Sequence, residues 1–416
     1  MQFTWQKISL LIGFILVSIA IGFGLYYFFF KTEPISTPTE EEESGSISEL
    51  AKPGDRTIIS GEDSADINIP AALEIIRRQP VAPAEEVSQT ASGGVTAVID
   101  VDVARTKEIA LDSTGNSILS YNQDSGLFYK IDDQGNKILL SNKKFADIEN
   151  ITWASKSEKA ILEFPDGSNI LYDFKSNKQT TLPKNWTEFD FSSSEDKIAF
   201  KDMDSNKDKR FIAIANTDGS GQKYLEAIGN KSNQININIS PTSQYIATFE
   251  KSNNSDLNTI YFIGQDNENF RSIELNGYGS SMQYTPTGQQ LIYSAHNSLN
   301  NNKPELYIVD ASGDNIGFNH KKLNLNTWAD KCTFATNDTM YCAVPKEMPD
   351  GAGWFRELAD NIPDNIYQVN VRTGATTFVA EPEYNYTIEQ MEVSSDGSTL
   401  FFTNKSTKTL HKIQLK

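Results

Sequence analysis

The sequence predicts an all-β, seven-bladed β-propeller behind an N-terminal transmembrane helix and a disordered linker. Three observations support this prediction: a charge-free apolar run at Ile8–Phe30, a long polar segment after it, and a turn-and-strand unit that recurs from about Thr106 onward. The expected boundaries are 1–31 for the cytoplasmic stub and helix, 32–93 for the linker and 94–416 for the propeller. A ring of six or eight blades remains an alternative.

The run Ile8–Phe30, "ISLLIGFILVSIAIGFGLYYFFF", is long enough to cross a membrane. A helix rises about 1.5 Å per residue, and a bilayer core is about 30 Å thick. Trp5 and Tyr27 lie near the ends of the run, where aromatic rings favour the membrane interface. The alternative is a cleaved signal peptide, but no A-x-A-like cleavage site follows Phe30. We therefore expect an uncleaved, single-pass anchor in the cell membrane.

Residues 32–69 are rich in Glu, Ser, Pro, Asp and Gly. Such a composition buries too little apolar surface to fold, so we interpret 32–93 as an acidic, flexible linker. The more apolar stretch at 70–79 is either a short helix docked on the folded domain or an apolar island of the linker.

The propeller prediction depends on a unit of a strand, a short polar turn and an alternating apolar strand. Alternation with a period of two is typical of strands, and a repeat of about 40 to 50 residues is typical of four-stranded blades. The last blade has only three strands before Lys416, so we expect Gly94–Val103 to supply its fourth and close the ring. The unit recurs as "LDSTGNSILSY", "WASKSEKAILEF", "FSSSEDKIAFK", "ISPTSQYIATFE", "YTPTGQQLIYSA", "FATNDTMYCAV" and "VSSDGSTLFFTN".

The segment "FDFSSSEDKIAFKDMDSNKDKRFIAIANTDGSGQKYL" resembles the WD40-like propeller repeat of the TolB family, as do "NISPTSQYIATF" and "VSSDGSTLFFT". The resemblance covers roughly the last 310 residues and implies a propeller fold. It does not imply the Tol-Pal role, because the anchor and the linker depart from TolB itself and no TolB-like amino-terminal domain is present.

Composition excludes several classes of function. The net charge is −18, and nucleic-acid binding requires a basic surface. Neither a nucleophile elbow, a P-loop nor a zinc-binding motif occurs, and the three histidines lack metal-ligand spacing. We therefore expect a protein that is not an enzyme and needs no cofactor.

One segment resembles half of a calcium-binding loop. Asp202, Asp204, Asn206 and Asp208 alternate as hard oxygen ligands would. The loop pattern fails at its sixth position, which is lysine instead of glycine, and at its twelfth, which is alanine instead of glutamate. The alternative is a polar hairpin between two strands.

Cys332 and Cys342 are expected to face each other across a hairpin that turns at Asn337-Asp338. Opposed residues of that kind come within disulfide range, and disulfides persist outside the cytoplasm. The pair therefore favours a propeller outside the cytoplasm. The alternative is two buried free thiols.

The connection Val344–Asn365 is the largest of a set of variable loops between second and third strands. Trp354, Phe355, Arg356 and Glu357 are its candidate binding residues, because long loops on a rigid scaffold commonly carry function. Either the aromatic pair is exposed for contact with protein or glycan, or it folds back and plugs the mouth of the propeller or covers blade six. We favour the plug, since an exposed Trp-Phe pair is costly.

These observations predict a membrane-anchored, extracytoplasmic propeller that acts as a protein-interaction or envelope scaffold module. Its expected partners are the membrane, through the N-terminal helix, and other envelope proteins or glycans. The alternatives are a glycan- or calcium-binding sensor and a propeller enzyme, such as a glycan lyase or hydrolase, that uses acidic loop residues.

Overall fold

The computed structural model describes residue 18, residues 86–253 and residues 257–416. Apart from residue 18, the predicted transmembrane helix lies outside these residues, as does the predicted helix at 70–79. Within the described ranges, no helix is long and apolar enough to cross a membrane. The propeller belongs to a compact unit that spans Pro80–Lys416.

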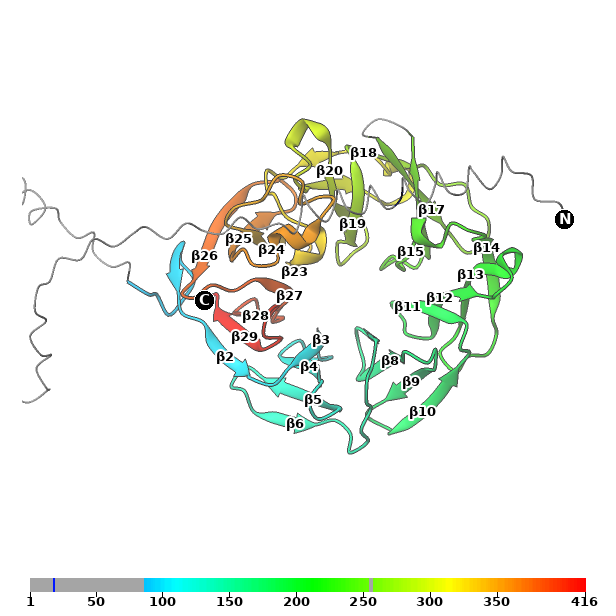
Figure 1. The fold of residues 1–416 in the computed structure, drawn as a ribbon, viewed down its shortest axis with the longest axis horizontal. Coiled ribbons are helices and arrows are strands. Elements are labelled where there is room, and N and C mark those ends of the chain that lie inside the picture. The colour runs from blue at the N-terminus through cyan, green and yellow to red at the C-terminus, as the bar shows by residue number, and fades with distance from the viewer. Residues whose placement is uncertain (1–17, 19–85, 254–256) are drawn as a thin grey trace, which may run out of the picture. The chain divides into compact units, whose positions relative to one another are not determined.

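Seven antiparallel sheets form a ring, and this confirms the predicted seven-bladed, all-β fold (Figure 1). The first strand of each blade lies nearest to the centre of the ring and the fourth at its periphery. Blade one contains β3 (Thr106–Leu111), β4 (Ser117–Asn122), β5 (Leu127–Asp132) and β6 (Lys137–Leu139). Blade two contains β7 (Asn150–Trp153), β8 (Lys159–Glu163), β9 (Asn169–Asp173) and β10 (Lys178–Leu182). Blade three contains β11 (Trp186–Phe191), β12 (Lys197–Met203), β13 (Arg210–Asn216) and β14 (Lys223–Ala227).

The remaining blades follow the same order of strands. Blade four contains β15 (Ile235–Ile237), β16 (Ala247–Ser252), β17 (Asn258–Ile263) and β18 (Ile273–Leu275). Blade five contains β19 (Tyr278–Tyr284), β20 (Gln290–His296), β21 (Glu305–Asp310) and β22 (Lys321–Lys322). Blade six contains β23 (Cys332–Thr336), β24 (Thr339–Pro345), β25 (Asp364–Asn370) and β26 (Thr376–Pro382), and blade seven contains β27 (Ile388–Val393), β28 (Thr399–Asn404) and β29 (Leu410–Gln414). The connections hold short 3₁₀ helices: η1 (Lys207–Lys209), η2 (Ser232–Gln234), η3 (Ser298–Asn300), η4 (Gly313–Asn315), η5 (Ala329–Lys331) and η6 (Arg356–Ala359).

The short turns between first and second strands owe their uniformity to polar side chains that bond the local backbone. In blade one, Asp112 accepts from the backbone N–H groups of Asn116 and Ser117. In blade seven, Ser394 and Ser398 donate to Asp396 and lower the pKa of that carboxyl to about 2. Such bonds satisfy backbone and side-chain groups together, so each turn fixes the register of its hairpin.

The ring is closed by two strands from before blade one, where the sequence suggested a single strand at Gly94–Val103. β2 (Ile99–Asp102) pairs antiparallel with β29 and is the fourth strand of blade seven. β1 (Gly94–Thr96) pairs parallel with β26 and adds a fifth strand to blade six. The segment divides because both blades present an unpaired outer edge, and the chain passes along one and then the other.

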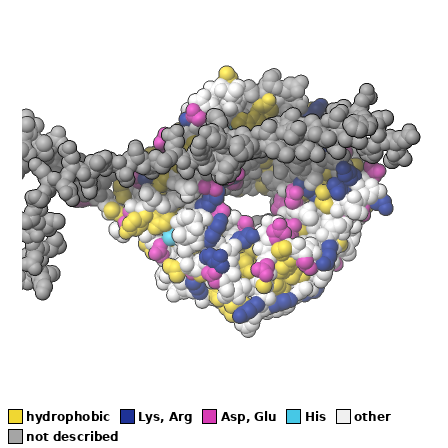
Figure 2. Space-filling model, in the orientation of Figure 1, with side chains coloured by type: hydrophobic (Ala, Val, Ile, Leu, Met, Phe, Trp, Pro, Cys, Tyr) yellow, Lys and Arg dark blue, Asp and Glu magenta, His cyan; other side chains and the backbone are white. Residues whose placement is uncertain are grey.

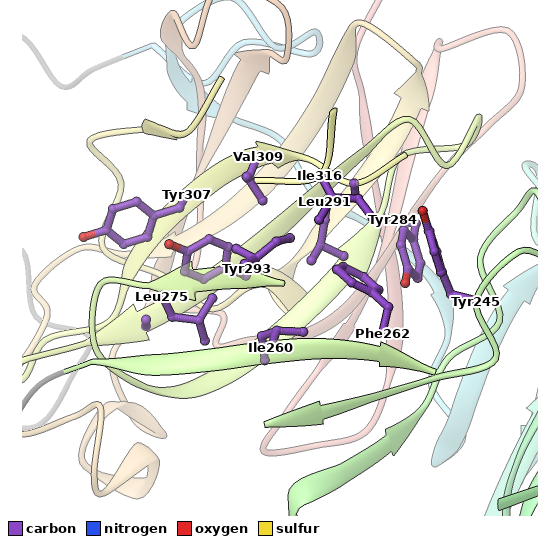
Figure 3. Close-up of a cluster of buried hydrophobic side chains, with 13 residues drawn as sticks. Tyr245, Ile260, Phe262, Leu275, Tyr284, Leu291, Tyr293, Tyr307, Val309 and Ile316 are labelled. Carbon is purple, nitrogen blue, oxygen red and sulfur yellow. The ribbon is translucent and has the colours of Figure 1, made fainter. Parts of the chain in front are cut away.

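Apolar side chains fill the spaces between neighbouring blades. Figure 3 shows such a cluster between blades four and five, in which Tyr245 and Phe262 face Leu291 and Tyr284. The second strands of the blades are buried at successive positions, as in β4, β8 and β12, so both faces of each sheet are covered. The core is thus distributed around the ring, and the central and peripheral edges are left for polar groups.

The disulfide expected from the sequence joins Cys332 and Cys342, which are paired directly in register across β23 and β24. Both residues are buried in the cluster between blades five and six. The bond fixes the hairpin that precedes the long insert. It therefore links the first two strands of blade six, and the insert begins at the end of the second of them.

Replacing both cysteines by alanine is expected to lower the free energy of unfolding by about 2–3 kcal/mol, since the bond closes a loop with a sequence separation of 10. Thermal melting with and without reductant measures the effect. The wild-type protein should lose stability in reductant, whereas the double alanine variant should not respond. Equal melting temperatures for the oxidised and the reduced wild-type protein would contradict this prediction.

Candidate functional site

The long insert between β24 and β25 is held firmly against the neighbouring loop of blade five. The backbone N–H groups of Gly351 and Gly353 donate to the carbonyls of Asn301 and Asn302 at 2.8 and 2.7 Å. A Cβ atom on Gly353 would lie 2.2 Å from Cγ of His296, so only glycine allows this close approach. The insert also has a small core of its own, formed by Trp328, Met348, Ala352 and Ala359.

The preferred prediction that Trp354 and Phe355 plug the propeller is wrong. Trp354 is 55% exposed and Phe355 is 64% exposed. One side of Trp354 packs against His296 and Tyr278, with ring centroids 4.4 and 5.4 Å away. Met348, Ala352 and Ala359 of the insert pack with Trp328, whereas Trp354 and Phe355 are left at the surface.

Exposed apolar residues continue on both of the joined loops. Leu358 in η6 is 51% exposed, and Leu299 in η3 is 93% exposed. Monomeric proteins rarely gather large apolar side chains in this way unless the surface binds something. We call the set of Leu299, Trp354, Phe355 and Leu358 the loop-face patch.

Arg356 differs from its aromatic neighbours because it turns toward blade six. Its guanidinium lies 4.7 Å from the centre of the Trp328 ring and forms a 2.7 Å ion pair with Asp330. Glu357 is exposed. Of the four predicted binding residues, three therefore face solvent and Arg356 is a half-buried anchor.

A cavity of about 390 Å³ lies beside the insert, between blades six and seven. Lys331 lines it from η5, and Trp328 lines it from the position just before η5. Arg356 belongs to the insert, Gln390 to β27 and Lys405 to the β28–β29 connection. The cavity opens on the same face as the loop-face patch, because second-to-third-strand connections share one face of a propeller.

Lys331, which lines this cavity, forms a buried ion pair with Asp364. The Nζ atom of Lys331 lies 2.7 Å from both carboxylate oxygens of Asp364, and the two side chains are 5% and 0% exposed. Asp364 also accepts from the backbone N–H of Ile388 at 2.7 Å. Burial lowers the pKa of Lys331 and raises the pKa of Asp364, and each charge opposes the shift of its partner.

Three carboxyl groups on the innermost strands have a raised pKa. Burial raises the pKa of Asp190 to about 6 and the pKa of Glu392 to about 7, although water reaches part of each side chain. Burial also raises the pKa of Glu108, which accepts a 2.5 Å hydrogen bond from Gln390.

The predicted calcium ligands do not converge. Asp202 is buried and accepts from Gln222 and Tyr224, whereas Asp204 and Asn206 accept from backbone N–H groups of their own turn. Across residues 86–253 and 257–416, no three acidic, histidine or cysteine side chains group in a way that could hold a metal ion. The alternating oxygens serve the turn that leads into η1, so this segment is a polar hairpin.

Several residues of this face were not predicted from the sequence. Leu299 and Leu358 had no signal beyond their place in long loops. Lys331 stands directly before Cys332 at the start of a buried strand, and a lysine there indicates a buried partner. Its partner Asp364 is 33 residues away, which no local pattern reveals.

No protein-family model matches this sequence, and no curated protein matches it. The structure is similar to the β-propeller domain of Cps50 (Swd1) from Myceliophteria thermophila. The TM-score is 0.50 at 11% identity, and the match covers 75% of this chain and 98% of that one. It is also similar to an oligogalacturonate lyase in complex with manganese, with a TM-score of 0.49 at 11% identity over 74% of this chain and 88% of that one.

At 11% identity the first of these similarities shows the fold alone. The chain folds as a seven-bladed β-propeller. It presents exposed apolar side chains beside a charged cavity on one face.

Proposed function

We propose that this chain is a membrane-anchored, extracytoplasmic and non-enzymatic protein-interaction module, and that the loop-face patch binds its partner. The observation that carries the proposal is the exposure of Trp354 and Phe355, at 55% and 64%, on an insert held in place by hydrogen bonds. Aromatic side chains on a rigid support bind with a low entropic cost. The charge-free run Ile8–Phe30 supports the anchor, and the disulfide supports a location outside the cytoplasm.

The charges around the patch indicate which partner it suits. Glu347, Asp350 and Glu357 belong to the same insert as the aromatic pair. Asp350 pairs with Lys303 at 3.1 Å, and the whole chain carries a net charge of −18. Elsewhere the two signs are mixed, and Figure 2 shows acidic and basic side chains interspersed over the visible face. Because complementary charge steers association, the partner we propose is a protein segment with apolar side chains flanked by lysine or arginine.

The test is a selection of random displayed peptides on the purified full-length chain. We expect enrichment of peptides that combine aromatic or aliphatic residues with flanking lysine or arginine. The variant Trp354→Ala/Phe355→Ser should weaken the selected peptides about 30-fold or more, since truncation of such anchors costs about 2 kcal/mol.

Ile138→Ser is the matched control, because Ile138 is 61% exposed on β6, far along the chain from the patch. It should leave peptide affinity unchanged. The proposal fails if the selected peptides bind the double variant as tightly as the wild-type protein, or if the enriched peptides are acidic. Thermal melting should show that both variants remain folded.

A further inference from the structure

The cavity between blades six and seven has a chemistry that differs from that of the loop-face patch. Its volume is about 390 Å³, within the range of roughly 300–1,000 Å³ that small-molecule sites occupy. Charged groups line it, so an apolar ligand would remove them from water without compensation. The ligand must therefore be polar.

The charges of the cavity are balanced in number and in position. Arg356 pairs with Asp330, Lys405 pairs with Asp360, and Lys331 pairs with the buried Asp364. The remaining acid, Glu389, pairs with Lys408 at 2.7 and 2.6 Å. Because each charge already has a counter-ion, a ligand with a net charge would lose its hydration and find no unpaired partner.

The same groups keep donors and acceptors for a neutral polar ligand. An ammonium group has three N–H donors, and Asp364 takes two from Lys331. The guanidinium of Arg356 has five, and the carboxylates of Asp360 and Glu389 have several lone pairs each. The cavity thus offers both donors and acceptors, which suits hydroxyl groups, since each of them donates and accepts.

The lining is also fixed before a ligand arrives. Arg356 stacks on Trp328. Gln390 donates to Glu108 and accepts from the backbone N–H of Ile109 at 3.1 Å. Side chains that are already ordered lose little entropy on binding, so modest hydrogen bonds can yield measurable affinity.

We infer that the cavity between blades six and seven is a binding site for a neutral saccharide of one or two sugar units, separate from the protein-binding patch. The charge-balanced lining, its remaining donors and acceptors and the volume carry this inference together. A zwitterionic or charged ligand of the same size is the competing occupant, which the experiment distinguishes.

The test is calorimetric titration of the purified full-length chain in a detergent without a sugar headgroup. The neutral probes are maltose, cellobiose, lactose and N,N′-diacetylchitobiose, and the charged probes are digalacturonic acid and the dipeptide Lys-Lys. At least one neutral disaccharide should bind with a Kd of about 1 mM or tighter. Both charged probes should bind about ten-fold more weakly or not at all.

Two cavity variants, Lys405→Met and Glu389→Gln, locate the site. Each should weaken the disaccharide about ten-fold, since each removes charged hydrogen-bonding capacity. The patch variant Trp354→Ala/Phe355→Ser should bind the disaccharide normally, so the two proposals fail independently. The inference is overturned if no neutral disaccharide binds at about 10 mM, if a charged probe binds more tightly, or if both folded cavity variants retain full affinity.

Discussion

Replacing Lys331 by methionine is expected to lower the free energy of unfolding by about 3–5 kcal/mol. Methionine preserves most of the side-chain volume but leaves the carboxylate of Asp364 buried without a counter-ion. Asp364 is fully buried, and its carboxylate otherwise accepts from the backbone N–H of Ile388 at 2.7 Å. Asp364→Asn should cost a similar amount, because it leaves the ammonium of Lys331 buried and uncompensated.

Denaturant unfolding of three variants measures this cost and its cause. The double variant Lys331→Met/Asp364→Leu should recover part of the loss, since no isolated charge remains. It should stay about 1–3 kcal/mol below the wild-type protein, because the N–H of Ile388 loses its acceptor. Lys184→Met is the control, since the Lys184–Asp166 pair is 67% and 65% exposed and should contribute about 1 kcal/mol or less. A loss below about 1 kcal/mol for Lys331→Met would show that the pair contributes no more than a surface one.

The same ion pair links the fold to the candidate sites. Lys331 ends η5 before blade six, Asp364 begins β25 after the insert, and Ile388 begins β27 of blade seven. One carboxylate thus fixes three segments that surround the cavity. A buried pair is weak evidence for stability, and here its position at a junction indicates that it holds the cavity wall and the base of the insert in one arrangement.

The ring of blades could be predicted from local pattern. Alternation along segments such as Lys197–Met203, followed by a turn of serine and aspartate, indicates a strand and its register without reference to distant residues. The pairing of Cys332 with Cys342 is equally local, since the two lie in one hairpin. The split of Gly94–Val103 between two blades could not be read from the sequence, because it depends on which outer edges the folded ring leaves open.

The candidate sites could be predicted only in part, because they depend on contacts between distant residues. The exposure of Trp354 follows from the close approach of Gly353 to His296, 57 residues earlier in the sequence. The cavity joins Lys331 to Lys405 across two blades. Conversely, the segment from Asp202 to Asp208 matches a calcium-ligand pattern in sequence. In the structure, Asp204 and Asn206 instead accept hydrogen bonds from the backbone of their own turn.

Introducing a carboxylate at the closing strand is expected to have the other large effect on stability. Val101 on β2 is buried in a cluster that joins blade seven to blade one, together with Ile118, Ile131 and Phe401. Val101→Asp removes about 1.5–3 kcal/mol of apolar burial and adds a charge beside Asp102, itself buried and paired with Lys137. The total loss should reach about 4 kcal/mol or more.

Val95→Asp is the matched control, because Val95 is half-buried on β1, the extra strand of blade six. It should cost about 1 kcal/mol or less, since blade six keeps four strands without β1. Hydrogen exchange should show early opening of β29 and β3 in Val101→Asp and normal protection in Val95→Asp. If the two variants melt alike, β2 is not the strand that closes the ring, and the cluster between blades seven and one holds the ends together without it.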